Sequence, residues 1–354
     1  MERVTSAQSQ RYKTAGFVVA GGLALLVAAA LYRWRSTPFR WQEFFDAITT
    51  VNWPWLAASM VLMLLTYVGR ALRWEVMLRP LRPKSSFLGL CSATIIGFTA
   101  IVLLGRAGEL VRPYLIAAKE KVPFSSQMAA WLLERILDTI VVLLVFGFAL
   151  TRISGHGLHF SVGLQWIVRT GGYIIASICA VCGLFLIVFR NFSEVAQRRI
   201  LAALTFLPKP AYDRIEGTLR AFSQGMQSTR THGFFGLLVV YTLLEWAIII
   251  AGYYAMFQAF AATSFFGWIE TLIFVGFVSL GSIVQIPGIG GGVQVAIIVV
   301  LTEIFGLSFE RSSGLALIIW LLSFVSIVPF GLMFAFHEGI NWKKFKHLPE
   351  DVPA

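Results

Sequence analysis

Long apolar runs constrain the fold of this chain more than any other feature of its sequence. Runs of about 18–25 residues recur along it, each long enough to cross a hydrocarbon core of about 30 Å as an α-helix. Hydrophobic residues make up 57% of the chain, and no run shows the period-2 alternation of an outer-membrane barrel. We therefore predict an all-α polytopic membrane protein, with a single membrane domain over 1–345 and a cytoplasmic tail over 337–354.

Full spans are predicted at six places along the chain, about 15–32, 53–73, 124–150, 166–189, 234–260 and 312–336. The net charge of +11 is concentrated in a few loops, and the positive-inside rule places those loops in the cytoplasm. Residues 166–232 are then a span followed by a basic cytoplasmic loop, and both termini are cytoplasmic. An alternative for the first run is a cleaved signal peptide, because Ala28-Ala29-Ala30 resembles a cleavage site.

Two apolar stretches are interrupted near their middle by residues that break a helix. In the first, the run from Phe87 to Leu104 is followed by Gly105-Arg106-Ala107-Gly108-Glu109 and then by a run too short to cross. Basic residues flank the stretch on both sides, so both of its ends belong in the cytoplasm. We therefore predict a re-entrant hairpin over 87–118, since irregular backbone is tolerated at membrane depth where it lines a cavity.

The second interrupted stretch has the same design. The run from Trp268 to Ile286 ends at Pro287-Gly288-Ile289-Gly290-Gly291-Gly292, and a shorter run continues to Phe305. Proline and four glycines are unfavourable inside a helix, so they predict the tip of a second hairpin.

The order of span, hairpin and span thus occurs twice, over 53–150 and over 234–336. The loop charges give the two copies opposite orientations in the membrane. Trp131-Leu132-Leu133 and Trp320-Leu321-Leu322 also fall at similar places in them. We predict two inverted repeats, which make eight hydrophobic segments in all: about six full spans and two hairpins, the architecture of many transporters.

Eight charged side chains interrupt the apolar runs of the first copy, where each costs roughly 2.5–3.5 kcal/mol on insertion scales. They are Arg70, Arg73, Arg106, Glu109, Arg112, Glu134, Arg135 and Asp138. Gln127, Trp131, Glu134 and Asp138 share one helical stripe, which we predict to face inward. Two interpretations stay open: the stripe lines a polar cavity, or its ion pairs only fix helix packing.

The five arginines of this set outnumber its three carboxylates, so we expect at least one guanidinium to remain for a substrate. A guanidinium is a fork of donors that suits phosphate. Arg106 and Arg112, which flank the first hairpin tip, are therefore candidate phosphate ligands. The alternative is that they neutralise Glu134 and Asp138.

Further candidates lie in the second copy. Glu245, in the middle of the 234–260 span, is either a proton carrier or the buried partner of an arginine. The helix that restarts at Val293 offers backbone N–H groups to an anion, unless the glycines serve only close helix approach. The candidates at this tip are Pro287, Gly288, Gly290, Gly291 and Gln294.

Several function classes are disfavoured. The longest polar connection, residues 190–232, is too short for most catalytic folds, and the glycine-rich run lacks the Lys-Ser/Thr of a nucleotide-binding loop. The five histidines show no metal-ligand spacing. We therefore expect no enzymatic activity, no cofactor, no metal and no nucleic-acid partner. Residues 38–50 form an amphipathic surface stretch that carries Glu43 and Asp46.

The motifs Arg106-x-Gly108-Glu109-x-x-Arg112 and Glu134-Arg135-x-x-Asp138 resemble those of the lysylphosphatidylglycerol synthase transmembrane-region family, also called the flippase-like domain family. Gly69-Arg70-x-x-Arg73 and the run from Pro287 to Gly292 resemble two further motifs of the family, so the likeness covers about 53–336. The chain departs from the family pattern in having no Asn and Pro before Arg106, and in having Gln294 where the family often has Glu.

The resemblance implies a bacterial inner-membrane protein that handles lipids. We expect a lipid flippase or lipid-transport module whose cavity takes an anionic or glycosylated headgroup. The alternatives are a membrane-embedded transferase that uses Glu43 or Asp46, and a scaffold for a lipid-modifying complex. The expected partners are a phospholipid or lipid-linked substrate, a glycosyltransferase or other lipid-modifying enzyme, and a second copy of the chain.

Overall fold

The computed structural model describes residues 39–153, 232–281 and 291–339, with isolated helical residues between 202 and 217. The spans predicted at 15–32 and 166–189, most of the basic loop and the end of the tail lie outside the described residues. The described part is helical, as predicted, apart from turns and one isolated bridge between Val51 and Phe260.

Long apolar helices dominate the described part. Four helical stretches in it are long and apolar enough to cross a bilayer: Trp53–Leu78, Phe87–Glu120, Gly233–Gln258 and Phe309–His337. Three of the predicted spans correspond to α3 (Trp53–Leu78), α6 (Phe124–Ile153) and α11 (His232–Gln258). The 30 residues of α6 are long enough to cross a bilayer. They are not uniformly apolar, because α6 carries charged residues in its middle.

The first hairpin consists of α4 (Phe87–Leu104), the 3₁₀ turn η1 (Gly105–Leu110) and α5 (Val111–Glu120). Its two ends lie together, because the Ser86 backbone N–H donates to Glu120 Oε1 at 3.0 Å. Its two arms touch through glycines: a Cβ on Gly97 would lie 2.5 Å from Arg112 Cβ, and one on Gly108 would lie 2.3 Å from the Ala100 carbonyl. This stretch therefore turns back on itself instead of crossing as one long helix.

The second hairpin is described apart from its tip, residues 282–290. Its arms are α12 (Trp268–Gly281) and α13 (Gly292–Val299), which continues as the π-helix η2 (Val300–Ile304). Its ends also meet, with the rings of Phe266 and Phe305 centred 4.5 Å apart. The second arm restarts at Gly292, one residue earlier than predicted, because Gly291 adopts a φ of 54° that other residues rarely take.

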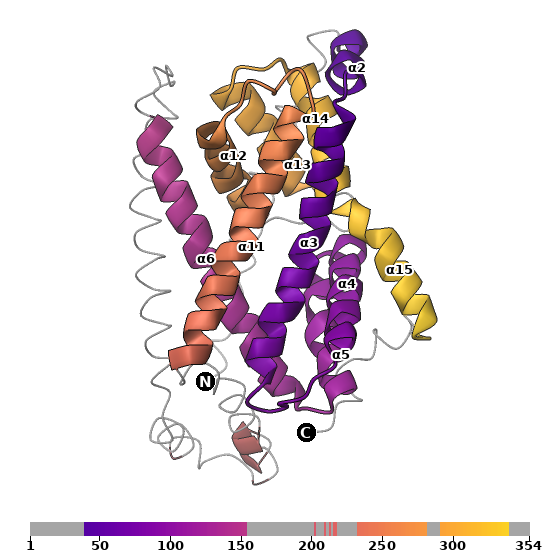
Figure 1. The fold of residues 1–354 in the computed structure, drawn as a ribbon, viewed down its shortest axis with the longest axis vertical. Coiled ribbons are helices and arrows are strands. Elements are labelled where there is room, and N and C mark those ends of the chain that lie inside the picture. The colour runs from indigo at the N-terminus through magenta and orange to yellow at the C-terminus, as the bar shows by residue number, and fades with distance from the viewer. Residues whose placement is uncertain are drawn as a thin grey trace, which may run out of the picture.

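The helices α3 and α11 form an antiparallel pair at the centre of the molecule (Figure 1). The Asn52 N–H donates to the Ala259 carbonyl at 2.8 Å, and Ser59 Oγ donates to the Gly252 carbonyl at 2.9 Å. In Figure 1, α4 and α5 lie beside the lower half of this pair, and α12 and α13 lie beside its upper half.

Packing between the two copies is reciprocal. The helix α12 of the second hairpin packs on α6, and α4 of the first hairpin packs on α15 (Val328–His337). Within each copy, the second arm of the hairpin packs on the helix that follows it, α5 on α6 and α13 on α14 (Phe309–Ser323). An inverted repeat requires these pairings, although the repeat itself stays a prediction.

The structure divides the last predicted span, 312–336, into α14, the 3₁₀ turn η3 (Val325–Ile327) and α15. Pro329 lies at the start of α15 and explains the break, because proline lacks an N–H and its ring clashes with the carbonyl four residues earlier. At the same place, Thr99 Oγ1 donates to the Ile327 carbonyl at 3.4 Å, which joins the broken helix to α4.

The short helix α2 (Trp41–Thr49) corresponds to the predicted amphipathic stretch and packs on α14. Glu43 accepts a hydrogen bond from Ser308 Oγ at 2.7 Å, and Arg40 contacts Glu310 at 3.5 Å. Tryptophans at this end are exposed, Trp53 by 71% and Trp268 by 54%. Exposed indoles at helix ends are typical of the membrane–water interface.

Candidate functional site

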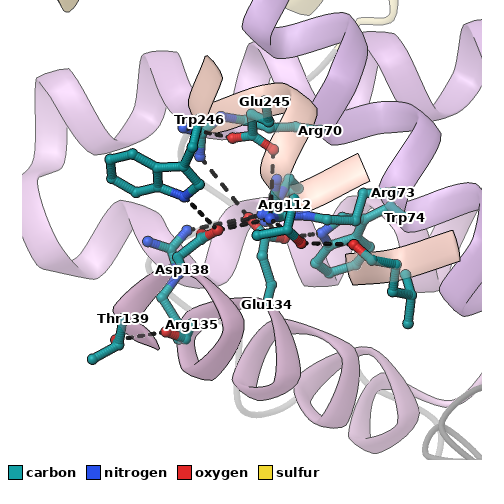
Figure 2. A network of polar contacts seen from close by, with 12 residues as sticks. Arg70, Arg73, Trp74, Arg112, Glu134, Arg135, Asp138, Thr139, Glu245 and Trp246 are labelled. Atoms are coloured by element: carbon teal, nitrogen blue, oxygen red, sulfur yellow. Dashed lines mark hydrogen bonds and ion pairs between the residues drawn. The ribbon is translucent and has the colours of Figure 1, made fainter. Parts of the chain in front are cut away.

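A network of buried charges joins α3, α6 and α11 where the three helices meet (Figure 2). Arg70 and Arg73 come from one face of α3, and Glu134 and Asp138 come from one face of α6, because their spacings of three and four residues repeat with the helix. Glu245 completes the network from the middle of α11, about 20 Å from either end of that helix at 1.5 Å per residue.

Arg73 contacts all three carboxylates of this network. Its Nη1 lies 2.7 Å from Asp138 Oδ1, and its Nη2 lies 3.2 Å from Asp138 Oδ2 and 2.9 Å from Glu134 Oε1. The Thr242 hydroxyl of α11 lies 3.2 Å from Nη1. Arg73 and Glu134 are both fully buried, so their charges depend on one another rather than on water.

Glu134 is the acidic centre of the network. Its Oε2 accepts hydrogen bonds from Arg112 Nη2 and from the Trp74 indole N–H. The Arg112 guanidinium also lies 4.5 Å above the Trp74 ring, a cation–π contact that α5 makes with α3. Glu134 therefore joins the first hairpin to the central helices.

Glu245 lies against two arginines of α3. Its Oε1 lies 3.0 Å from Arg70 Nη2, and its Oε2 lies 3.5 Å from Arg73 Nη1. The neighbouring Trp246 indole N–H points to Asp138 Oδ1 at 3.4 Å. The network is thus held from α11 through both an ion pair and an indole.

A cavity of about 400 Å³ opens beside this network, between the tip of the first hairpin and the α12 arm of the second. Its charged and polar lining residues include Thr66, Tyr67, Arg70, Arg106, Glu109, Arg135, Asp138, Thr139 and Trp246. Its apolar lining residues are Met63, Phe98, Ile101, Val102, Val142, Leu143, Ile249, Val275, Val278 and Phe324, and the remaining lining residues are Tyr253, Ser279 and Ser323. The lining of this space therefore combines charged and apolar side chains.

The predicted site residues separate into three groups. Arg70, Arg106, Glu109, Arg135 and Asp138 line the cavity. Arg73, Arg112, Glu134 and Glu245 lie behind its wall, buried in the charge network. Away from the cavity lie Gln127, which is buried and donates to Ser126 Oγ at 3.0 Å, and Gly291 and Gln294 of the second hairpin, while Pro287, Gly288 and Gly290 fall outside the described residues.

The inward orientation predicted for the α6 stripe agrees with these positions. Gln127 and Glu134 are buried, and the Asp138 side chain is only 13% exposed. Each of the two interpretations of the stripe is supported by one residue. Glu134 pairs with Arg112 and so contributes to helix packing, whereas Asp138 lines the cavity.

Sequence reasoning missed the two indoles that hold the carboxylates. Trp74 and Trp246 donate to Glu134 and Asp138, and each follows a charged residue of the network in sequence, Arg73 or Glu245. A tryptophan in the middle of a span is a detectable signal, because its N–H needs an acceptor that lipid does not provide.

The lining of the cavity provides donors for a polar ligand. Among the described residues no group of histidine, cysteine and carboxylate side chains could hold a metal ion. The cavity offers guanidinium and indole donors together with hydrocarbon side chains, and such a combination can bind an amphiphile.

Comparison with known proteins agrees with this membrane architecture. The glycosyltransferase AglD of Haloferax volcanii is 25% identical over 259 residues, which make up 65% of this chain and 39% of the relative, so the chain spans well under two thirds of that protein. No solved structure matches the chain. The lysylphosphatidylglycerol synthase transmembrane region matches residues 15–331, which confirms the predicted resemblance. The protein therefore belongs to the lysylphosphatidylglycerol synthase transmembrane-region family and is a multi-pass membrane protein with a lipid-related function.

Proposed function

We propose that this protein moves a lipid between the leaflets of the bacterial inner membrane by receiving its headgroup in the charged cavity. The observation that carries this proposal is a cavity whose lining combines charged side chains with apolar ones. A lipid headgroup bound at Arg70, Arg135 and Asp138 would avoid the free-energy cost of placing an unpaired phosphate charge in hydrocarbon. The acyl chains of the same lipid would stay among apolar side chains and surrounding lipid.

The two hairpins meet at the cavity. Its lining includes residues of η1 from the first hairpin and of α12 from the second. Transporters built from broken helices bind substrate at this kind of junction and expose it to each side in turn. This proposal places the basic loops in the cytoplasm, so that α2 and the exposed Trp53 and Trp268 would lie at the outer surface.

The direct test is leaflet exchange in vesicles that contain the purified protein. Fluorescent analogues of anionic, zwitterionic and glycosylated lipids are placed in both leaflets, and dithionite then reduces the outer ones. Because uncatalysed headgroup crossing is slow, we expect the protein to increase the fraction of at least one analogue that dithionite reaches within minutes. Equal fractions in protein-containing and protein-free vesicles, for every lipid of the panel, would remove the proposal.

A second candidate function is a lipid-handling component of a glycolipid-synthesising complex. It is favoured by the name of the relative, a glycosyltransferase, although the match covers only 39% of that protein.

The transferase alternative would use Glu43 or Asp46 at the membrane surface. Glu43 already accepts from Ser308 and pairs with Arg40, contacts that account for it as the residue docking α2 on α14. Retained exchange in Glu43→Gln and Asp46→Asn variants would separate transport from transfer.

A further inference from the structure

Arg135 is held differently from the other arginines of the charge network. The side chains of Arg73 and Arg112 are 0% and 4% exposed, whereas that of Arg135 is 37% exposed. Within the described residues its one ion pair is with Glu134 Oε1, at 3.4 Å. Glu134 also contacts Arg73 at 2.9 Å, Arg70 at 3.9 Å and Arg112, so Arg135 shares its one carboxylate with three other guanidinium groups.

Charge counting shows an excess of arginine in the network to which Arg135 belongs. Within the described residues, the network contains four guanidinium groups (Arg70, Arg73, Arg112 and Arg135) and three carboxylates (Glu134, Asp138 and Glu245), an excess of one positive charge. The cavity lining repeats this excess, since Arg70, Arg106 and Arg135 face Glu109 and Asp138.

Among the described residues, the three carboxylates are each already paired with an arginine. Asp138 is bound by both Nη atoms of Arg73, Glu245 by Arg70, and Glu109 by Arg106 at 3.3 Å. The buried Nε atoms of Arg135 and Arg70 have no hydrogen-bond partner among the described residues, and the same holds for Arg73 Nε and Arg112 Nη1. The arginines of the network therefore have more donors than the described acceptors satisfy.

We infer that Arg135 is the residue of this cavity that holds the phosphate of a lipid headgroup, with Arg70 beside it, and that the cavity selects headgroups of net negative charge. This inference rests on the proposed function. A phosphodiester supplies acceptor oxygens for the guanidinium fork and one negative charge to match the excess. A zwitterionic headgroup brings no net charge, and an aminoacylated cationic headgroup adds to the excess instead of cancelling it.

The substitution Arg135→Gln tests this residue without removing a charge that the fold needs. It changes the network from four cations against three anions to three against three, so the empty protein should unfold at the wild-type temperature or above. A residue that only stabilised the fold would lower it. Arg135→Lys keeps the positive charge but loses the forked guanidinium. It therefore separates the contribution of charge to phosphate binding from the contribution of the paired N–H donors.

The experiment measures lipid binding to the purified full chain in detergent by thermal unfolding, followed through tryptophan fluorescence. The probes are dioctanoyl phosphatidylglycerol, dioctanoyl phosphatidylcholine and inorganic phosphate. We expect phosphatidylglycerol to raise the unfolding temperature of the wild type more than either other probe, because ligands that bind only the folded state stabilise it. In Arg135→Gln the affinity for phosphatidylglycerol should fall about ten-fold or more, and in Arg135→Lys by less.

Arg79→Gln is the matched control, because Arg79 lies at the end of α3, away from the cavity lining, and pairs with Glu75 at 3.3 Å. It removes the same charge and should leave the lipid preference unchanged. If phosphatidylcholine stabilised the protein as much as phosphatidylglycerol does, the inferred selection for net negative charge would be wrong. If inorganic phosphate stabilised it as much as phosphatidylglycerol does, the inference that the ligand is a lipid would be wrong. Unchanged affinity in Arg135→Gln would overturn the role of this residue.

These outcomes are distinguishable from failure of the proposed function. Selective binding that depends on Arg135, together with no leaflet exchange, would support the anion site and reject transport. Leaflet exchange with no preference for anionic lipids, and no effect of Arg135→Gln, would support transport and reject the anion site.

Discussion

Replacing Glu134 by glutamine is expected to lower the free energy of unfolding by about 3–5 kcal/mol, the usual cost of removing one partner from a buried ion pair. The substitution keeps the shape of the side chain and removes only its charge. Arg73 and Arg112 would then remain buried at 0% and 4% side-chain exposure with one carboxylate fewer to balance them. Chemical unfolding of the purified protein in mixed micelles measures the loss.

Two further variants show whether charge is the cause. Glu303→Gln is the matched control, because Glu303 is exposed on η2, and it should change the free energy of unfolding by less than about 0.5 kcal/mol. Combining Glu134→Gln with Arg112→Met restores the original excess of one cation and should recover about 1–3 kcal/mol. A double variant no more stable than the sum of its parts would contradict the charge balance assigned to this network.

Replacing Gly108 by valine is expected to prevent the first hairpin from closing and to cost about 3 kcal/mol of stability, the upper end for overpacking. A Cβ at this position would lie 2.3 Å from both the carbon and the oxygen of the Ala100 carbonyl. Those are backbone atoms of α4, so no side chain can rotate to make room. The arms would separate, and with them the Arg112 contacts to Glu134 and Trp74.

Gly236→Ala is the control for this second prediction. Nothing lies within 4 Å of a Cβ on Gly236, and alanine favours a helix over glycine, so this variant should be as stable as the wild type or slightly more so. Thermal unfolding and gel filtration of the two variants compare them directly. A Gly108→Val protein that is monodisperse and unfolds at the wild-type temperature would show that the tight hairpin tip is not needed.

Much of the architecture could be predicted because bilayer physics leaves few choices. The apolar run after Leu104 is too short to cross, and basic residues flank the whole stretch from 87 to 118, so a hairpin was the simplest prediction. Glu120 and Ser86, at the two ends of this stretch, do lie together. The break at η3 was missed because residues 312–336 are uniformly apolar, and the local effect of Pro329 was outweighed by hydropathy. Length and composition specify a span, while local backbone chemistry specifies whether it is continuous.

The candidate site was predictable in its residues but not in their partners. Spacing placed Glu134 and Asp138 on one face of α6, but which arginine meets which carboxylate depends on how the hairpin packs. Arg112 was a candidate phosphate ligand at the hairpin tip, and the structure instead buries it against Glu134 and Trp74. Arg135, one residue off the stripe, lies at the cavity wall. Helical periodicity gives direction around one helix and nothing about its neighbours.

The passage of headgroups through the cavity is tested most directly by leaflet exchange in two tryptophan variants of α6. Val142 lines the cavity, whereas Leu144 on the same helix is 62% exposed on the outer surface of the protein. If lipid headgroups pass through this space, Val142→Trp fills it and reduces exchange to the protein-free rate, while Leu144→Trp leaves the wild-type rate. Equal exchange rates in the two variants, with both folded, would show that lipid crosses elsewhere.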